Sequence, residues 1–78
     1  MNEQTVAVLK AVRYLEREFG ATTVRDVQAH CQFTSSSIAS YWLAKARARG
    51  FVTWRNGAAR TIKLTEKGRA SLEEWRAA

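Results

Sequence analysis

The sequence predicts a mainly α fold with one small β-hairpin, an α+β arrangement in which three helices precede the hairpin and a last helix follows it. Apolar residues recur at helical spacing in three segments before residue 50. An Asn-Gly pair at residues 56–57 separates two β-prone runs, which is a strong hairpin signal. The chain has 78 residues without repeats or linkers, so we expect residues 1–78 to form a single domain.

The first helix is expected over residues 4–19, with Gly20 as its C-terminal stop. Its inward face is predicted from residues at 3.6 spacing, namely Thr5, Val8, Leu9, Val12, Leu15 and Phe19. The second helix starts at Thr23 and ends near Cys31. Thr23 and Asp26 have the spacing of a capping box, and the residues predicted to point inward are Val24, Val27 and Cys31.

The third helix follows a run of hydroxyl residues, 34–37, any of which can cap it, and is expected to end at Arg49 before Gly50. At 100° per residue, its apolar side consists of Ala39, Trp42, Leu43 and Ala46. The opposite side consists of Ser37, Tyr41, Ala44, Lys45 and Ala48, with Ser40 at its edge. This outward face therefore presents two long hydrogen-bond donors among small residues and carries no acid.

The hairpin is predicted to pair residues 51–55 with residues 60–64, and its loop length decides which side chains share a face. An even loop places Phe51 and Thr53 on the face of Ile62 and Leu64, whereas an odd loop places Val52 and Trp54 there. Burial of apolar side chains favours an odd loop of three or five residues.

Thr65 is expected to cap the last helix, about residues 66–77, with Leu72 and Trp75 on one face. Gly68 lies inside this helix, where glycine costs roughly 1 kcal/mol relative to alanine.

The charge distribution is the strongest functional signal. The formal charge of +6 lies entirely within residues 27–65, which hold six basic residues and no acid, while the rest of the chain sums to zero. Solubilising faces usually mix both signs, so this pattern indicates a surface that meets a polyanion.

The composition excludes several other classes. No apolar run approaches the ~18 residues of a membrane span, and we expect no signal peptide, no membrane partner and a cytoplasmic protein. The single Cys31 and single His30 are too few for a zinc site, so we expect no metal and no cofactor, and Cys31 is interpreted as a core residue. One His and scattered acids leave no catalytic arrangement, so the protein is not expected to be an enzyme.

The predicted order of elements is that of a winged helix-turn-helix: a three-helix core, a wing and a C-terminal helix. A single helix fits the major groove of B-DNA, which is about 12 Å wide. We therefore expect a sequence-specific transcriptional regulator that binds double-stranded DNA, with helix 34–49 in the major groove and wing 51–64 on the backbone or in the minor groove.

Several segments carry a resemblance to known regulators. Residues 23–27, 33–37, 41–43 and 49–52 (TVRDV, FTSSS, YWL and RGFV) are similar to the DNA-binding domain of LexA-type repressors. Residues 64–68 (LTEKG) resemble the junction between wing and helix in MarR-type regulators. The resemblance spans roughly residues 5–70 and implies DNA binding. This chain lacks the Ser-Lys protease domain of LexA-type repressors, so no self-cleavage is implied.

Three positions depart from the LexA-type pattern. Gln28 and Gln32 stand where Ala and Gly are usual, and Ala46 replaces a Leu. Gln32 is therefore expected to adopt the tight turn at a cost in strain, or else the turn differs from the one in LexA-type repressors.

Ten residues are candidates for contacting DNA. The predicted base-reading residues are Ser37, Ser40, Tyr41 and Lys45. The predicted phosphate contacts are Arg25, Ser35 and Ser36, with helix capping as the alternative for both serines. The predicted wing-tip residues are Arg55, Asn56 and Arg60, and turn chemistry is the favoured explanation for Asn56. Arg47 and Arg49 are expected to complement the helix dipole and to cover apolar surface.

Two other functions stay open. A winged helix can act as a protein-interaction or adaptor module without binding DNA, or the basic and aromatic residues can bind RNA or single strands. A homodimer is a further expectation, through Tyr14, Leu72 and Trp75. The small size is typical of compact regulators, including repressors, of bacteria, plasmids and phages. We expect such a regulator to be associated with the nucleoid when it is bound to DNA.

Overall fold

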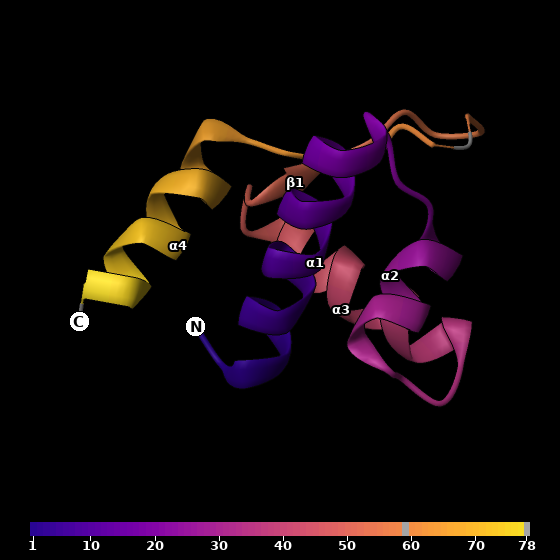
Figure 1. Ribbon diagram of the computed structural model, residues 1–78, viewed down its shortest axis with the longest axis horizontal. Coiled ribbons are helices and arrows are strands. Elements are labelled where there is room, and N and C mark those ends of the chain that lie inside the picture. The colour runs from indigo at the N-terminus through magenta and orange to yellow at the C-terminus, as the bar shows by residue number, and fades with distance from the viewer. Residues whose placement is uncertain (59, 78) are drawn as a thin grey trace.

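The computed structural model describes residues 1–58 and 60–77. Its elements follow in the order α1 (Glu3–Phe19), α2 (Val24–Cys31), α3 (Ser36–Ala48), β1 (Val52–Thr53), β2 (Lys63–Leu64) and α4 (Glu66–Ala77). Helices α1, α2 and α3 pack on one another, and α4 lies on the side of α1 away from α2 (Figure 1). This is the winged helix-turn-helix architecture, with residues 51–64 as the wing, so the predicted fold class is confirmed.

The core lies where the three helices meet the base of the wing. Leu9 of α1, Val27 of α2 and Leu43 of α3 are almost completely buried together with Val52 and Leu64 of the wing. The prediction that Phe19 points inward is wrong, because its side chain is 71% exposed. Phe19 is the last residue of α1, where Gly20 turns the chain away, so it projects past the elements that cover the rest of that face.

Local capping chemistry explains where the helices start. The Thr23 side chain accepts a hydrogen bond from the Asp26 amide at 3.1 Å, and the Asp26 carboxylate accepts one from the Thr23 amide at 3.0 Å. The predicted capping box of α2 is therefore confirmed. Thr65 likewise caps α4, since its hydroxyl oxygen accepts a hydrogen bond from the Gly68 amide at 3.0 Å.

The turn between α2 and α3 forces one side-chain-bearing residue into the left-handed region. Gln32 has φ 58° and ψ 35°, the conformation that glycine usually supplies at the end of a helix. The Phe33 amide donates to the Gln28 carbonyl at 3.1 Å, and this bond closes the turn. The strain expected at this position is therefore present in the fold.

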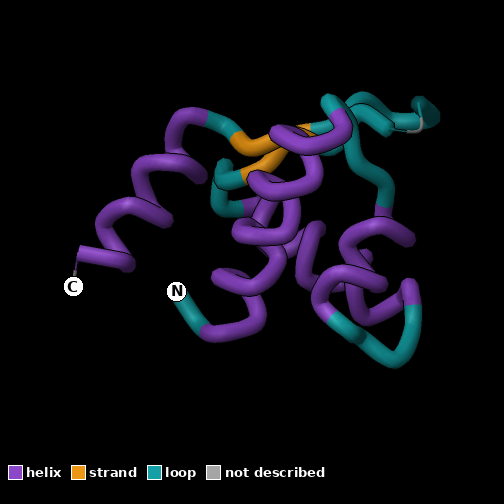
Figure 2. Tube along the Cα trace, viewed as in Figure 1, coloured by secondary structure: helices purple, strands orange, loops and turns teal. Residues whose placement is uncertain are grey.

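The wing has the predicted register but a longer loop. Val52 pairs with Leu64 and Thr53 with Lys63, which is the odd alternative. The expected loop of three or five residues is wrong, because the ladder ends at Thr53 and Lys63, and residues 54–58 and 60–62 run as loop and turn (Figure 2). The Arg55 amide donates to the Thr61 hydroxyl at 2.9 Å instead of a carbonyl of the opposite strand, so a side chain replaces the ladder there.

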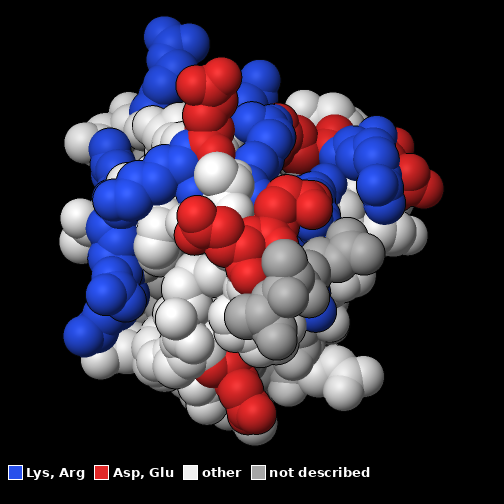
Figure 3. Space-filling model, turned by 90° about the vertical axis from the view of Figure 1, so that its left-hand side faces the viewer, with Lys and Arg blue, Asp and Glu red and all other residues white. Residues whose placement is uncertain are grey.

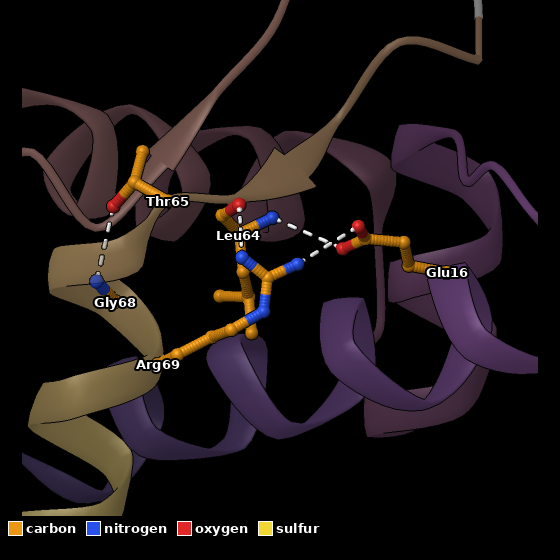
Figure 4. Close-up of polar contacts among 5 residues, drawn as sticks. All are labelled: Glu16, Leu64, Thr65, Gly68 and Arg69. Carbon is orange, nitrogen blue, oxygen red and sulfur yellow. Dashed lines mark hydrogen bonds and ion pairs between the residues drawn. The ribbon is translucent and has the colours of Figure 1, made fainter.

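A polar network joins the wing to α1 and α4 (Figure 4). The Glu16 carboxylate accepts hydrogen bonds from the Leu64 amide at 3.2 Å and from the Arg69 guanidinium at 3.1 Å. Arg69 also donates to the Leu64 carbonyl at 3.3 Å. Both backbone groups of Leu64 are therefore held, and α1, β2 and α4 meet at this residue.

Helix α4 closes over α1, which corrects the expected dimer surface. Leu72 has no exposed surface, so it belongs to the core of its own chain and is not available to a second copy. Trp75 is 42% exposed, and the Lys10 ammonium of α1 lies 5.2 Å from the centre of its ring. The structure therefore shows the alternative, in which the face of Leu72 and Trp75 packs on the first helix.

Gly68 is required by a close backbone crossing. A Cβ atom at this position would lie 2.1 Å from the Phe51 carbonyl oxygen and 3.2 Å from a methyl carbon of Leu64. The Thr65 amide donates to the same Phe51 carbonyl at 3.0 Å, so the carbonyl cannot move away without losing that bond. Helix propensity alone predicts that alanine at residue 68 would stabilise the protein, whereas the close crossing predicts that it would destabilise it.

We expect Gly68→Ala to lower the free energy of unfolding by about 3 kcal/mol, at the upper end of overpacking costs, because the clash is with backbone. Urea denaturation followed by circular dichroism measures this change. Ala70→Gly, at an exposed position of the same helix, is the matched control and should cost only about 1 kcal/mol. If the Gly68→Ala protein were more stable than the parent, residue 68 would not lie as close to the Phe51 carbonyl as described.

We expect Gln32→Gly to raise stability by about 0.5–1 kcal/mol. The substitution removes roughly 1–2 kcal/mol of left-handed strain and loses roughly 0.5–1 kcal/mol to the greater freedom of glycine in the unfolded chain. The melting temperature should rise by a few degrees. Ala29→Gly, inside α2, should lower it, and a decrease for Gln32→Gly would show that its conformation is not strained.

Candidate nucleic-acid interface

The outward face of α3 is exposed as predicted. All six of its predicted residues lie on the surface, namely Ser37, Ser40, Tyr41, Ala44, Lys45 and Ala48. Ala39, Leu43 and Ala46 on the opposite side are buried, while Trp42 is half-buried and packs against the core. The 3.6-residue periodicity therefore separates core from surface correctly along this helix.

The two long side chains of this face contact each other. The Lys45 ammonium lies 5.5 Å from the centre of the Tyr41 ring, as expected for residues one turn apart. Tyr41 is 53% exposed, and its ring meets the Trp42 ring edge-on at a centroid distance of 5.0 Å. Because Trp42 packs on the core, it supports Tyr41 from below, and Tyr41 in turn limits the positions that Lys45 can take.

The N-terminus of α3 combines a cap with exposed hydroxyls. The Ser35 hydroxyl accepts a hydrogen bond from the Ile38 amide at 3.3 Å, so Ser35 is the N-cap. Ser36 and Ser37 are exposed in the first turn, which contains no acidic residue. Amides at a helix N-terminus favour anions, so this end of α3 suits phosphate oxygens. Arg25, near the start of α2, is also exposed.

The wing tip presents two exposed arginines, Arg55 and Arg60. The Ala58 amide donates to the Arg55 carbonyl at 3.2 Å, which closes a turn around Asn56-Gly57. Arg60 has φ 60°, a left-handed conformation. The Asn56 side-chain oxygen accepts a hydrogen bond from Arg47 at 3.1 Å, so Asn56 contacts its own chain as well as forming the turn.

A cleft of about 480 Å³ lies between α3, the start of α2 and the wing. It brings together four of the ten candidate residues, namely Ser40, Arg55, Asn56 and Arg60. Apolar side chains also line it, from Val24, Leu43, Trp54 and Ile62. The other candidates, Arg25, Ser35, Ser36, Ser37, Tyr41 and Lys45, do not line this cleft.

The acidic residues are absent from α3 and the wing. The acids belong to α1, the start of α2 and α4, whereas residues 27–65, which form α3 and the wing, have none. Figure 3 shows the side on which α4 lies, where carboxylates and basic side chains are mixed and a row of basic side chains runs along the left edge. Asp26 and Glu66 flank this region in sequence, and Asp26 is engaged in its capping box.

Sequence reasoning missed the main role of Arg47. Its guanidinium stacks on Trp54 with the carbon 4.2 Å from the ring centre, which agrees with the predicted cover of apolar surface. It also donates to the Trp54 carbonyl at 3.2 Å and to Asn56. No spacing in the sequence indicates these bonds, since they depend on where the wing folds back relative to α3.

Within residues 1–58 and 60–77, no three His, Cys, Asp or Glu side chains gather as a metal-ligand set. The Cys31 thiol donates to the Ala7 carbonyl at 3.6 Å, and burial raises the pKa of this thiol, so it stays protonated. None of the helices in the described part of the chain is both long and apolar enough to cross a membrane.

The chain shares its fold with two solved structures. No family model and no curated protein matches it. Among solved structures, Bordetella bronchiseptica BpsR, whose DNA binding is regulated by 6-hydroxynicotinic acid, superposes on 99% of the chain with a TM-score of 0.80 and 22% identity. The chain spans about half, 53%, of that BpsR chain.

A candidate DNA-binding protein from Ralstonia eutropha JMP134 superposes with a TM-score of 0.71 and 23% identity, covering 96% of each chain. At identities this low, the two similarities establish the fold and no more. The more specific resemblance to LexA-type repressors finds no support in them and stays a prediction.

We expect Ser35→Ala to cost about 1 kcal/mol of stability, because it removes the N-cap of α3. Ser36→Ala, one residue further on and exposed, should change stability by less than about 0.5 kcal/mol. Thermal denaturation of the two variants measures the difference. Equal effects would show that the capping bond of Ser35 contributes little.

Proposed function

We propose that the protein is a non-enzymatic transcriptional regulator that binds double-stranded DNA in a sequence-specific manner. The observation that carries the proposal is an exposed, acid-free face on α3 that continues across a cleft to two arginines on the wing. The fold shared with BpsR and with the Ralstonia protein supports it. Such a regulator acts in the cytoplasm, at the nucleoid.

In this proposal α3 enters the major groove. Its outward side chains are small apart from Tyr41 and Lys45, so the helix backbone can approach the base edges closely. Tyr41 and Lys45 supply donors for bases, and the Ser37 and Ser40 hydroxyls suit either base of a pair. The amides and hydroxyls of the first turn, Ser36 among them, hold a phosphate and fix the register of the helix.

The cleft then accommodates the sugar-phosphate strand that separates the two grooves. Its apolar lining, which includes Val24 and Ile62, suits the deoxyribose carbons, and Arg55 and Arg60 suit the phosphates or the minor groove. Arg25 reaches the same strand from the start of α2. A bound strand would thus contact α2, α3 and the wing together.

Salt dependence of duplex binding tests the proposal. With a duplex chosen by selection from random sequences, log K should fall linearly with log salt, with a slope of several units. Arg55→Ala and Arg60→Ala should each reduce the slope by about 0.9, the effect of one phosphate contact. Lys45→Ala and Tyr41→Ala should cost about 1–3 kcal/mol on the selected site and much less on random duplex.

Lys10→Ala is the matched control, because it removes one charge from α1, where Lys10 lies over Trp75 of α4, and should leave binding nearly unchanged. Equal losses for Tyr41→Ala and Lys45→Ala on every duplex would refute specific reading by these residues. Absence of duplex binding at low salt would refute the proposal and favour the protein-interaction module. In that case, NMR shift changes at Tyr14 and Trp75, which are 40% and 42% exposed, would indicate a protein partner or a second copy.

A further inference from the structure

We propose that Arg47 is a positioning residue that sets the place of the wing relative to α3, and that Asn56 serves mainly as its partner. The inference rests on the proposed function for its effect on DNA, but its effect on the free protein is independent of it. Arg47 uses three contacts at once: hydrogen bonds to the Trp54 carbonyl (3.2 Å) and the Asn56 side chain (3.1 Å), and stacking on the Trp54 ring (4.2 Å).

The wing needs such a contact because its own ladder is short. Pairing ends at Thr53 and Lys63, and the bonds of Thr61 to Arg55 and Ala58 hold the tip together internally without fixing it to the helices. The Phe51 amide donates to the Ala46 carbonyl at 2.9 Å and holds only the base of the wing, whereas the two Arg47 hydrogen bonds join α3 to Trp54 and Asn56, beyond the ladder. A planar guanidinium that donates in two directions restrains the wing more than a single bond would.

The position of these bonds matters for the cleft. Trp54, Arg55 and Asn56 line the cleft from the wing side, and Ser40 lines it from α3. Arg47 ties Trp54 and Asn56, on either side of Arg55 in the chain, to the same helix that carries Ser40. Arg47 therefore fixes the spacing between the base-reading helix and the wing arginines.

This role makes a distinctive prediction for DNA binding. Losing one phosphate contact lowers the salt slope by about 0.9. Arg47→Ala should lower it by about two units, because both Arg55 and Arg60 lose their positions. In an Arg55→Ala/Arg60→Ala background, Arg47→Ala should have almost no further effect, since no wing contact is left to position.

Arg49→Ala is the matched control. It removes the same charge from the C-terminal end of the same helix, but Arg49 lies over Phe51, with its guanidinium carbon 6.0 Å from the ring centre, rather than on the wing tip. It should lower the slope by about 0.9 or less in both backgrounds. Asn56→Ala should reproduce part of the Arg47→Ala effect, and the double variant should be no worse than Arg47→Ala alone.

The free protein gives a test that does not involve DNA. Arg47→Ala should lower the heteronuclear NOE of the residue 54–58 amides and shift the Trp54 indole resonance, while Arg49→Ala leaves both unchanged. Unchanged wing amides in Arg47→Ala would overturn the inference whatever the DNA results. A slope change of about 0.9 that persists without Arg55 and Arg60 would also overturn it, by showing that Arg47 contacts phosphate directly. Failure of the parent protein to bind DNA would refute only the proposed function.

Discussion

The Phe51 carbonyl group is the point through which the wing and α4 are fixed to the helical core. It accepts a hydrogen bond from the Thr65 amide, and α4 passes so close to it that no side chain fits at residue 68. The Thr65 hydroxyl meanwhile donates to the Gly50 carbonyl and accepts from the Gly68 amide. The end of α3, the base of the wing and the start of α4 are therefore one unit, and this crossing fixes the base from which the wing projects.

Features that depend on neighbours in sequence were predictable. The capping box at Thr23, the Thr65 cap and the exposed face of α3 all follow from spacings of three or four residues. The register of Val52 opposite Leu64 followed from the preference for burying apolar side chains. The left-handed Gln32 was one of two outcomes expected from the resemblance to LexA-type repressors, which usually have Gly at this position.

Features that depend on distant segments were not predictable. Leu72 lies on an apolar helix face, but only the fold shows that α1 covers it rather than a second copy. Gly68 looks like a weak helix residue until the Phe51 carbonyl is placed beside it. In the candidate interface, periodicity indicated Tyr41 and Lys45, whereas the bond between Arg47 and Asn56 required the position of a loop whose length was itself mispredicted.

The separation of acids from the basic stretch has a consequence for how the molecule moves. Since residues 27–65 carry all of the net charge and the acids lie on other elements, the centres of positive and negative charge do not coincide. The protein therefore has a permanent electric dipole moment, and near a polyanion it experiences a torque as well as an attraction. In the proposed binding to DNA, that torque acts within a Debye length, about 8 Å in physiological salt, and turns α3 and the wing toward the duplex before contact, which raises the association rate.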